Sequence, residues 1–498
     1  MTRQHCLVTG ATGYIGGRLV PHLLAAGHDV RVLARTPAKL DGVAWADQVE
    51  VVQGDLGDVD SLTSAATGID VFYNLVHSMG GSEDFASEEA ANAHNIVEAT
   101  TAAEVDRIVY LSGLHPRDDD NWSTHLASRI EVGRILMAGP VPTVVLQAGV
   151  VIGSGSASFE LIRHLTERLP VMTTPRWVHN RIQPIAIVDA LHYLVEAATA
   201  PIPTDRAWDI GSPDVMTYGD MMSTYARVAG LGRRHRVVLR PLTPTLASRW
   251  VGLVTPIPPG LARPLIESLE CDAIMVDHDI DEVIPRPSGG LLSYEQAVLD
   301  AIDHDHQGIV DLAWSDVDPL EAPAAPMPND PDWSGELLFT DDTQVRVDAP
   351  AERVLAAARD LVGGAVGLDR LPSVPASSIG ALVTGTEPDT ESNTESDTES
   401  DTESGDEPAP RQWEQASAGT HGDVLLSARA PIPARLWLEV RTRPSDAGTT
   451  TVGIRLVCAP RGLGGISWWH AVWPLRSQAQ RDLATAISER AIREGAGE

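Results

Sequence analysis

The sequence predicts an α/β protein in which a doubly wound parallel sheet is followed by a second, smaller α+β unit. Three observations support this prediction. Apolar runs of strand length alternate with amphipathic helical stretches from residue 6 to about residue 150. A proline-rich acidic stretch interrupts the chain near residue 320, and a new strand pattern begins after it. The chain, at 498 residues, is also much longer than the ~100–200 residues of one domain.

Six candidate strands form the sheet of the first unit. They are CLVTG (6–10), DVRVLAR (29–35), VEVVQGD (49–55), DVFYNLV (70–76), RIVYLSG (107–113) and PTVVLQAGV (142–150). Between the first two strands, Ile15, Leu19 and Leu23 recur at four-residue spacing, which predicts a helix with one face on the sheet. Such alternation of strand and helix is typical of a parallel sheet covered on both faces.

Composition shifts divide the chain into two folded units. We expect the first unit to span residues 1–314 and a proline-rich linker to occupy residues 315–332. The second unit is expected over residues 333–498, with an insertion at 386–407 that repeats Thr-Glu-Ser, contains ten acidic residues and has nothing to bury. We interpret this insertion as a disordered spacer, with a functional acidic arm as the alternative.

The second unit begins with two alternating strands and one helix, and continues with three strands and a final helix. The expected segments are ELLFT (336–340), TQVRVDA (343–349), a helix at 350–361, DVLLSARAPI (423–432), ARLWLEVRTR (434–443) and TTTVGIRLVCAP (449–460). The final helix should carry Leu475, Ala479, Leu483 and Ile487 on one face.

Charge and cysteine usage limit the possible partners. The chain has 69 acidic against 37 basic side chains, a net charge of −32, which disfavours nucleic acid and anionic membranes. The three cysteines match no zinc spacing and complete no disulfide framework, which favours a cytoplasmic location. The uncharged run 135–159 is broken by glycines and prolines, and the N-terminus enters a strand pattern at once, so we expect neither a membrane span nor an export signal.

The strongest motif is the glycine-rich sequence VTGATGYIGG between the first strand and the first helix. Its glycines, Gly10, Gly13 and Gly16, suit a tight turn, a close approach of pyrophosphate to bare backbone, and close packing of helix on strand. The start of the helix then offers unpaired N–H groups to phosphate. The motif predicts a Rossmann-type dinucleotide site. The expected contact residues in this turn are Gly10, Thr12, Gly13, Tyr14, Ile15 and Gly16.

Residues at the ends of the next strands indicate which cofactor the site would bind. Arg35 ends the second strand, where an NAD-selective site usually has a carboxylate, so its guanidinium favours the 2′-phosphate of NADP(H). Asp55 closes the third strand and is placed to accept a hydrogen bond from the adenine amino group, with a helix cap as the alternative. Leu75 and Val76, at the end of the fourth strand, and His77, directly after it, are expected to contact the cofactor, with His77 near the nicotinamide.

The chain resembles a known family over roughly residues 5 to 310. The motifs VTGATGYIGG, GDL, YNLVHSM, YLSGL, STHLASR and TPRWVHNRIQPIAIVDA are similar to the atypical, NmrA-like branch of the extended short-chain dehydrogenase/reductase family, which is related to the nucleotide-binding accessory subunit of respiratory complex I. The resemblance implies a Rossmann-type fold, NAD(P) binding and hydride transfer.

This sequence differs from the family pattern at the catalytic centre. The family uses a tyrosine, a lysine four residues later and a serine. Ser112 matches the serine, but the tyrosine and lysine positions hold His125 and Arg129, and Lys39 is the only lysine in the chain. We consider His125 a candidate proton donor and Arg129 a candidate contact to the nicotinamide ribose, with both as plain polar helix residues in the alternative interpretation. A nearby arginine would lower the pKa of His125.

The second unit resembles a domain of unassigned function that follows such reductase-like domains in bacteria. The similar segments are GELLF, LVGGAVGL, LWLEV and RGLGGISWWHAVWP, and the order of elements also resembles the helix-grip (SRPBCC/START-like) fold used for apolar ligands. The sequence leaves three functions open. They are an NADP(H)-dependent reductase acting on a small apolar carbonyl or enone, a non-catalytic NADP(H) sensor or assembly factor, and a carrier of a lipid-like ligand. No metal site and no particular protein partner are indicated.

Overall fold

The structure is a computed structural model, and it resolves two compact units, one containing Met1–Asp305 and the other Glu336–Glu498. The described residues are 2–77, 85–116, 122–174, 176–202, 205–238, 251, 255–307, 337–363, 413–418, 424–428, 432, 434–445, 448–460 and 462–493. The expected linker at 315–332 and the expected acidic insertion at 386–407 lie outside them. Each unit is described by itself.

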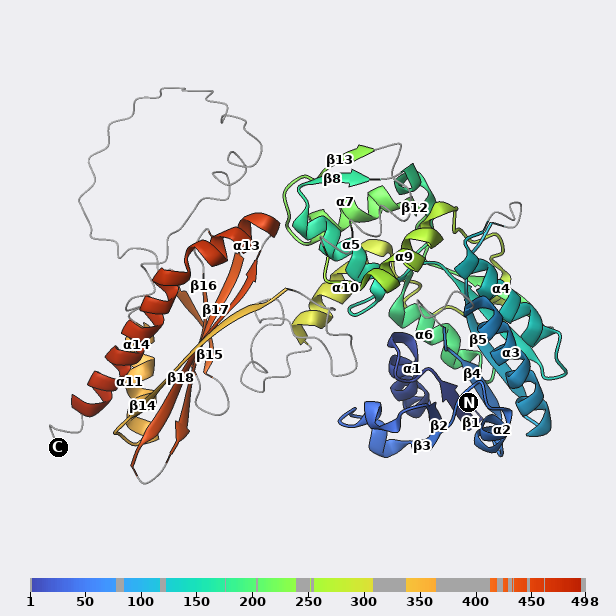
Figure 1. The fold of residues 1–498 in the computed structure, drawn as a ribbon, viewed down its shortest axis with the longest axis horizontal. Coiled ribbons are helices and arrows are strands. Elements are labelled where there is room, and N and C mark those ends of the chain that lie inside the picture. Colours follow the sequence, from blue (N-terminus) through green and yellow to red (C-terminus); the bar gives the residue numbers. More distant parts are fainter. Residues whose placement is uncertain are drawn as a thin grey trace. The chain divides into compact units, whose positions relative to one another are not determined.

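Seven parallel strands form the main sheet of the first unit, in the order β11-β6-β5-β4-β1-β2-β3. Figure 1 labels β1 to β5 of this sheet. Their bounds are β1 His5–Thr9, β2 Asp29–Ala34, β3 Glu50–Gln53, β4 Val71–Asn74, β5 Arg107–Gly113, β6 Thr143–Ala148 and β11 Arg206–Ile210. The order reverses between β1 and β4, which is where open α/β sheets bind ligands. This sheet confirms the predicted Rossmann-type α/β fold, and its first six strands are those predicted. The seventh strand, β11, was not predicted.

Helices cover both faces of this sheet. Side chains alternate along β1, so Cys6 and Val8 join one apolar cluster and Leu7 joins another. The first cluster packs under α1 (Tyr14–Ala25) and α6 (Ile187–Glu196), and the second under α2 (Val59–Ala66), α3 (Phe85–Ala102) and α4 (Thr124–Met137). The predicted helix over Ile15, Leu19 and Leu23 is therefore confirmed as α1.

The rest of the first unit forms a third apolar cluster beyond the carboxyl ends of the strands. Its helices are α5 Ala157–Arg168, α7 Tyr218–Val228, α9 Pro259–Glu267 and α10 Tyr294–Gln307. Three two-stranded sheets join it, built from β7 Val151–Ile152 with β10 Ile185–Ala186, β8 Val171–Thr174 with β13 His235–Val238, and β9 Arg181–Ile182 with β12 Met216–Thr217. Short 3₁₀ turns occupy η1 Pro37–Leu40, η2 Ala46–Gln48, η3 Arg176–His179, η4 Ser268–Glu270 and η5 Asp279–Glu282.

The second unit contains a five-stranded antiparallel sheet in the order β14-β18-β17-β16-β15. Its elements are β14 Phe339–Val347, α11 Ala351–Gly363, β15 Trp413–Ala418, β16 Val424–Ala428, β17 Ala434–Pro444, β18 Thr450–Pro460, α13 Gly462–Ala471 and α14 Trp473–Arg493. In α14, Ala479, Leu483 and Ile487 are buried as predicted, whereas Leu475 is exposed.

One prediction for this unit is wrong. The segments at 336–340 and 343–349 were expected to be two strands, but Phe339–Val347 forms the single strand β14. The pair Asp341 and Asp342 suggests a turn in the sequence. In the structure Asp341 binds Arg476 and Asp342 binds Arg455, so both carboxylates are accommodated along a continuous strand.

Across the described part of the chain, every helix is either too short or too polar to cross a membrane.

Candidate functional site

The glycine turn is built so that its glycines cannot be replaced without strain. Gly10 has a φ of +76°, and a Cβ atom added there would lie 2.8 Å from the carbonyl oxygen of Leu75. A Cβ added at Gly16 would lie 2.4 Å from the carbonyl oxygen of Gly10. Gly13 donates its N–H to that same carbonyl at 2.9 Å and precedes α1, whose first turn has no side-chain cap. The N–H groups at the start of α1 are therefore available to a phosphate.

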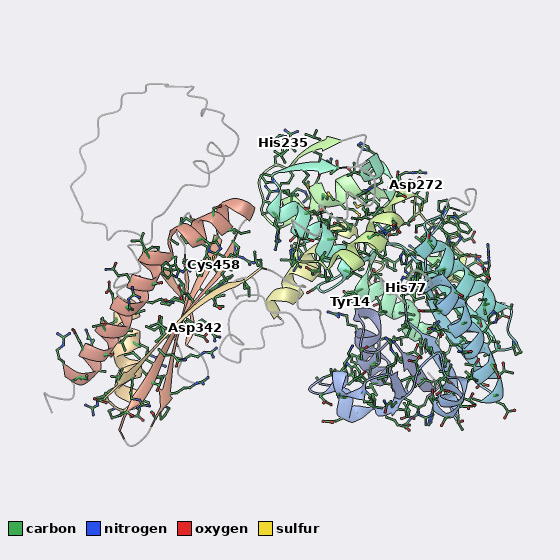
Figure 2. The ribbon with its side chains drawn as sticks, viewed as in Figure 1. Tyr14, His77, His235, Asp272, Asp342 and Cys458 are labelled. Carbon is green, nitrogen blue, oxygen red and sulfur yellow. The ribbon has the colours of Figure 1, made fainter. Side chains whose placement is uncertain are left out.

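A cavity of about 350 Å³ opens beside this turn. It lies at the carboxyl ends of β1, β4, β5 and β6, next to the point where the strand order reverses. Figure 2 marks Tyr14, at the start of α1, and His77, after β4, both of which line this cavity. The predicted site residues that line it are Gly10, Gly13, Tyr14, Ile15, Gly16, Leu75, Val76, His77, Ser112, His125 and Arg129. Thr12, Arg35 and Asp55 are outside its lining.

Arg35 and Asp55 lie at the ends of neighbouring strands, beside the glycine turn. Arg35 directly follows β2 and is exposed, and its guanidinium has no hydrogen bond or ion pair with any described residue. Asp55 is exposed and accepts a hydrogen bond from the N–H of Gly57 at 2.8 Å. The helix-cap alternative for Asp55 is wrong, because Asp58 caps α2. Its expected contact with adenine remains a prediction.

Ser112 and Arg129 link β5 to α4. The hydroxyl of Ser112 donates to the carbonyl oxygen of Arg129 at 3.4 Å, and the phenol of Tyr110 donates to the same oxygen at 3.2 Å. In return, the guanidinium of Arg129 donates to the carbonyl oxygen of Leu111 at 3.1 Å, while its Nε is buried without a hydrogen-bond partner. These contacts fix both side chains in the cavity wall.

His125 lies on α4, in the first turn, and its ring stacks on Phe85 with centroids 4.1 Å apart. Its Nδ1 is buried and has no hydrogen-bond partner. Burial is the largest cause that lowers the pKa of His125, and the His77 imidazole and the Arg263 guanidinium lower it further. The predicted direction is confirmed. Its predicted cause is wrong, because Arg129 is not among the groups that lower the pKa of His125.

The buried carboxylate of Glu89, which was not predicted as a site residue, contacts His77. Nδ1 of His77 lies 2.8 Å from Oε1 of Glu89 on α3, and the hydroxyl of Ser128 on α4 donates to Oε2 of the same carboxylate. Burial lowers the pKa of His77, Glu89 raises it and Arg129 lowers it, with a net decrease. Glu89 occupies an ordinary position in a helix, so only the fold reveals its role.

The cavity lining outside the glycine turn is mainly apolar. Its members are Leu114, Leu126, Val150, Ile182, Pro264, Leu265 and Ala273, with the hydroxyls of Tyr218, Ser156, Ser158 and Ser268 among them. Burial raises the pKa of the Tyr218 phenol well above its usual range, so that group is neutral. Among the described residues that line the cavity, Arg129 carries the only permanent charge.

Part of the first unit matches a known family. Residues 10–139 match a family of NAD(P)H-binding domains, and this segment contains the glycine turn and the cavity-lining ends of β4 and β5. The first unit is thus similar to NAD(P)H-binding domains, and its strand order is that of a Rossmann-type fold.

Curated relatives of this NAD(P)-binding unit include several named reductases and dehydrogenases. A 3β-hydroxysteroid dehydrogenase/isomerase of Mycobacterium tuberculosis is 35% identical over 116 residues, which cover 21% of this chain and only 30% of that enzyme. A ceramide reductase of Caulobacter vibrioides is 28% identical over 47% of this chain and 73% of its own length. A (4-alkanoyl-5-oxo-2,5-dihydrofuran-3-yl)methyl phosphate reductase of Streptomyces griseus is 26% identical over 53% of this chain and 86% of its own length.

Solved structures of similar fold include two cofactor complexes. A triphenylmethane reductase of Citrobacter with NADP(H) has a TM-score of 0.47 and 18% identity, and the match covers 60% of this chain and 99% of that one. An NADPH-dependent quinone oxidoreductase of Escherichia coli with NADPH has a TM-score of 0.45 and 19% identity, and the match covers 59% of this chain and 98% of that one.

The two cavity histidines predict an acid-sensitive NAD(P)-binding unit. The pKa values of His77 and His125 are both lowered in the folded chain, so the unfolded chain binds more protons as the pH falls below ~6.5. The free energy of unfolding should therefore decrease as the pH falls from ~7 through the lowered pKa values. Thermal unfolding between pH 7.5 and 5 measures this. The double variant His77→Gln/His125→Gln should lose less stability over that range, and an unchanged slope would contradict the assignment.

Proposed function

We propose that the chain is an NADP(H)-dependent reductase that transfers hydride to a small, mainly apolar carbonyl or enone compound. The observation that carries this proposal is a single cavity that contains both the glycine turn and a set of titratable and hydrogen-bonding side chains at the strand ends. A turn alone would support only nucleotide binding. The adjoining space lined by Ser112, His77 and His125 adds groups that can act on a second molecule.

The cavity lining supports the proposed substrate class. The cavity lining outside the glycine turn offers apolar surface from Leu126, Ile182 and Leu265, with a few hydroxyls and, among the described lining residues, no carboxylate. Apolar surface stabilises a substrate by about 25 cal/mol per Å² removed from water. A cationic substrate would lose its hydration without finding a carboxylate among these residues. A neutral molecule with one carbonyl is therefore the best match.

Arg35 supports NADP(H) over NAD(H) in this proposal. Its guanidinium is exposed at the end of β2 and makes no side-chain bond to a described residue, so it is free to form paired, charge-assisted hydrogen bonds with a 2′-phosphate. Asp55 follows the adjacent strand β3, and its carboxylate is exposed. We expect this carboxylate to accept a hydrogen bond from the adenine amino group.

The proposed reaction needs both a hydride and a proton. The reduced nicotinamide supplies the hydride when the cofactor is bound. We expect the hydroxyl of Ser112 to orient the carbonyl oxygen and Arg129 to contact the nicotinamide ribose. Two imidazoles, those of His77 and His125, reach the cavity and can supply the proton, as no tyrosine–lysine pair exists in the sequence.

The test of this function is NADPH oxidation, followed at 340 nm with ketones, aromatic aldehydes, enones and quinones. We expect turnover with at least one apolar carbonyl or enone, faster with NADPH than with NADH. Removing the turn with Gly16→Ala should abolish that turnover. Failure of the wild-type chain to oxidise NADPH with any of these compounds would contradict the proposal.

A non-catalytic NADP(H) sensor or assembly factor is the second candidate. It is favoured by one observation, the absence of the tyrosine–lysine pair through which the resembling family moves its proton. A sensor must bind NADPH and NADP⁺ with different affinities, and it must pass that difference to a partner. Calorimetry with NADPH and NADP⁺, together with the turnover assay, separates this candidate from the reductase. Unequal affinities without turnover would favour the sensor, and equal affinities without turnover would contradict both candidates.

We further propose that the second unit has a helix-grip-like fold and holds an apolar ligand, either as a carrier or to supply the substrate. The support is its element order, with a helix after the first strand, an antiparallel sheet and a long last helix packed on the core through Leu483 and Ile487. Native mass spectrometry of the full chain tests this, and a chain that never retains a lipid-sized molecule would contradict it. The free state of all three cysteines agrees with the cytoplasmic location we propose.

A further inference from the structure

The cavity contains two histidines, and their surroundings differ. The ring of His77 is held at Nδ1 by the carboxylate of Glu89 at 2.8 Å. The ring of His125, which lies edge-on to it with centroids 6.1 Å apart, is held only by stacking on Phe85, and its Nδ1 has no hydrogen-bond partner. A histidine that moves protons needs one defined tautomer, which a bonded carboxylate supplies. The carboxylate contact therefore makes His77, rather than His125, the better candidate for proton transfer.

Glu89 connects three elements at the end of the sheet. It lies on α3, its carboxylate bonds to His77 after β4, and it also accepts from Ser128 on α4. Its side chain is 8% exposed, and that of His77 is 18% exposed. A buried carboxylate costs several kcal/mol unless it is paired and hydrogen-bonded, and here His77 and Ser128 provide those two contacts.

The bond to Glu89 determines which nitrogen of His77 faces the cavity. When Nδ1–H donates to Oε1, the neutral ring has its lone pair on Nε2. No described residue bonds to Nε2, that atom is not among the buried atoms that lack a partner, and His77 lines the cavity. Nε2 is thus open to a molecule bound beside the glycine turn.

We propose that His77 is the catalytic residue that exchanges the proton with the substrate oxygen, and that Glu89, braced by Ser128, is its positioning residue. This inference rests on the proposed reductase function. In the reducing direction, hydride adds to the carbonyl carbon and the C=O π pair moves to oxygen. The Nε2–H bond of protonated His77 breaks, its proton joins that oxygen, and the ring is left neutral with its lone pair on Nε2. Solvent then restores the proton.

The charges around His77 set the pH dependence of this step. Burial and the Arg129 guanidinium on α4 disfavour the protonated ring, and the Glu89 carboxylate on α3 favours it. The imidazole of His125 on α4, edge-on to that of His77, repels the protonated ring when it is itself protonated. The phenol of Tyr110 on β5 is neutral, because burial raises its pKa. Reduction should therefore accelerate as the pH falls through the pKa of His77. The reverse reaction should accelerate as the pH rises.

The experiment compares Glu89→Gln and His77→Gln with the wild-type full chain, using trans-cinnamaldehyde and NADPH. Glutamine at 89 keeps the shape and an acceptor for Nδ1–H but removes the charge, so the fall of kcat with rising pH should move to lower pH by about one unit. His77→Gln should lower kcat at least ~100-fold, with the affinity for NADPH unchanged within ~3-fold. His125→Gln should lower kcat by less.

Matched controls lie on the same helix. Glu98→Gln and His94→Gln change exposed residues of α3 and should leave both kcat and the pH profile unchanged. A second readout needs no substrate, because ¹⁵N NMR of the full chain reports the tautomer and the pKa of His77. We expect Nδ1 to carry the proton in the neutral ring, and we expect Glu89→Gln to lower the pKa.

The outcomes separate the two proposals. If the wild-type chain reduces cinnamaldehyde but His77→Gln retains its rate and pH profile, the role of His77 is wrong and the reductase function stands. If the neutral ring of His77 carries its proton on Nε2, or if the pKa of His77 is unchanged in Glu89→Gln, the proposed role of Glu89 is wrong. If the wild-type chain reduces neither cinnamaldehyde nor any other carbonyl, the proposed function fails, and this inference fails with it.

Discussion

Gly16→Ala is expected to abolish NADPH binding, with a loss of affinity of at least ~100-fold. The new methyl carbon would lie 2.4 Å from the carbonyl oxygen of Gly10 and 2.9 Å from Cα of Ala11, and backbone atoms cannot move aside as a flexible side chain can. The turn must open, which displaces the N–H groups that hold the phosphates. Overpacking of this kind also costs about 1–3 kcal/mol of stability. Fluorescence titration with NADPH and thermal unfolding measure the two effects.

Gly232→Ala is the matched control for that variant. A Cβ atom at Gly232 meets nothing within 4 Å, and its φ is not positive. This control should bind NADPH as the wild type does. NADPH binding that survives Gly16→Ala with an affinity close to wild type would show that the cofactor does not use this turn.

Arg35→Ala is expected to weaken NADPH binding by ~10–100-fold and to leave NADH binding within ~3-fold. A hydrogen bond to a charged group contributes about 1.5–3 kcal/mol, and only NADPH has the 2′-phosphate that Arg35 would bind. Because the guanidinium makes no bond to a described residue, its removal should not disturb the fold. Isothermal titration calorimetry with both cofactors, at fixed salt, measures the change.

Arg134→Ala serves as the control for charge alone. Arg134 is an exposed arginine on α4, distant in sequence from β2, and its nearest carboxylate oxygen, on Glu131, is 3.7 Å away. Its removal changes the net charge by the same amount but should leave NADPH binding unchanged. Equal losses of NADPH and NADH affinity in Arg35→Ala would contradict a role for Arg35 in cofactor choice.

The sequence predicts most of the main sheet well because strands such as β1, β4 and β6 are apolar runs that are buried on both faces. Elements with charged residues inside them are harder to predict. β11 carries Arg206 and Asp209, whose side chains bind residues far along the chain, among them Asp279 and Val276. In the second unit, β14 contains two adjacent aspartates that suggest a turn. Their arginine partners come from β18 and α14, and only the folded chain brings these together.

The candidate site also has a part that the sequence predicts and a part that it does not. Its turn is local in sequence, so Gly10, Gly13 and Gly16 could be identified from spacing alone. The pairing of His77 with Glu89 and Ser128 could not, since those residues belong to different elements and no spacing rule connects them. For the same reason, the sequence analysis assigned a lowered pKa at His125 to Arg129 as a neighbour on its helix, whereas burial in the folded chain is the first cause.

The most direct test of the account is a calorimetric titration of the wild-type full chain with NADPH and, separately, with NADH. We expect one NADPH site per chain, with an affinity at least ~10-fold higher than for NADH, which corresponds to about 1.4 kcal/mol. A chain that binds neither cofactor, or that binds NADH more tightly, would contradict it.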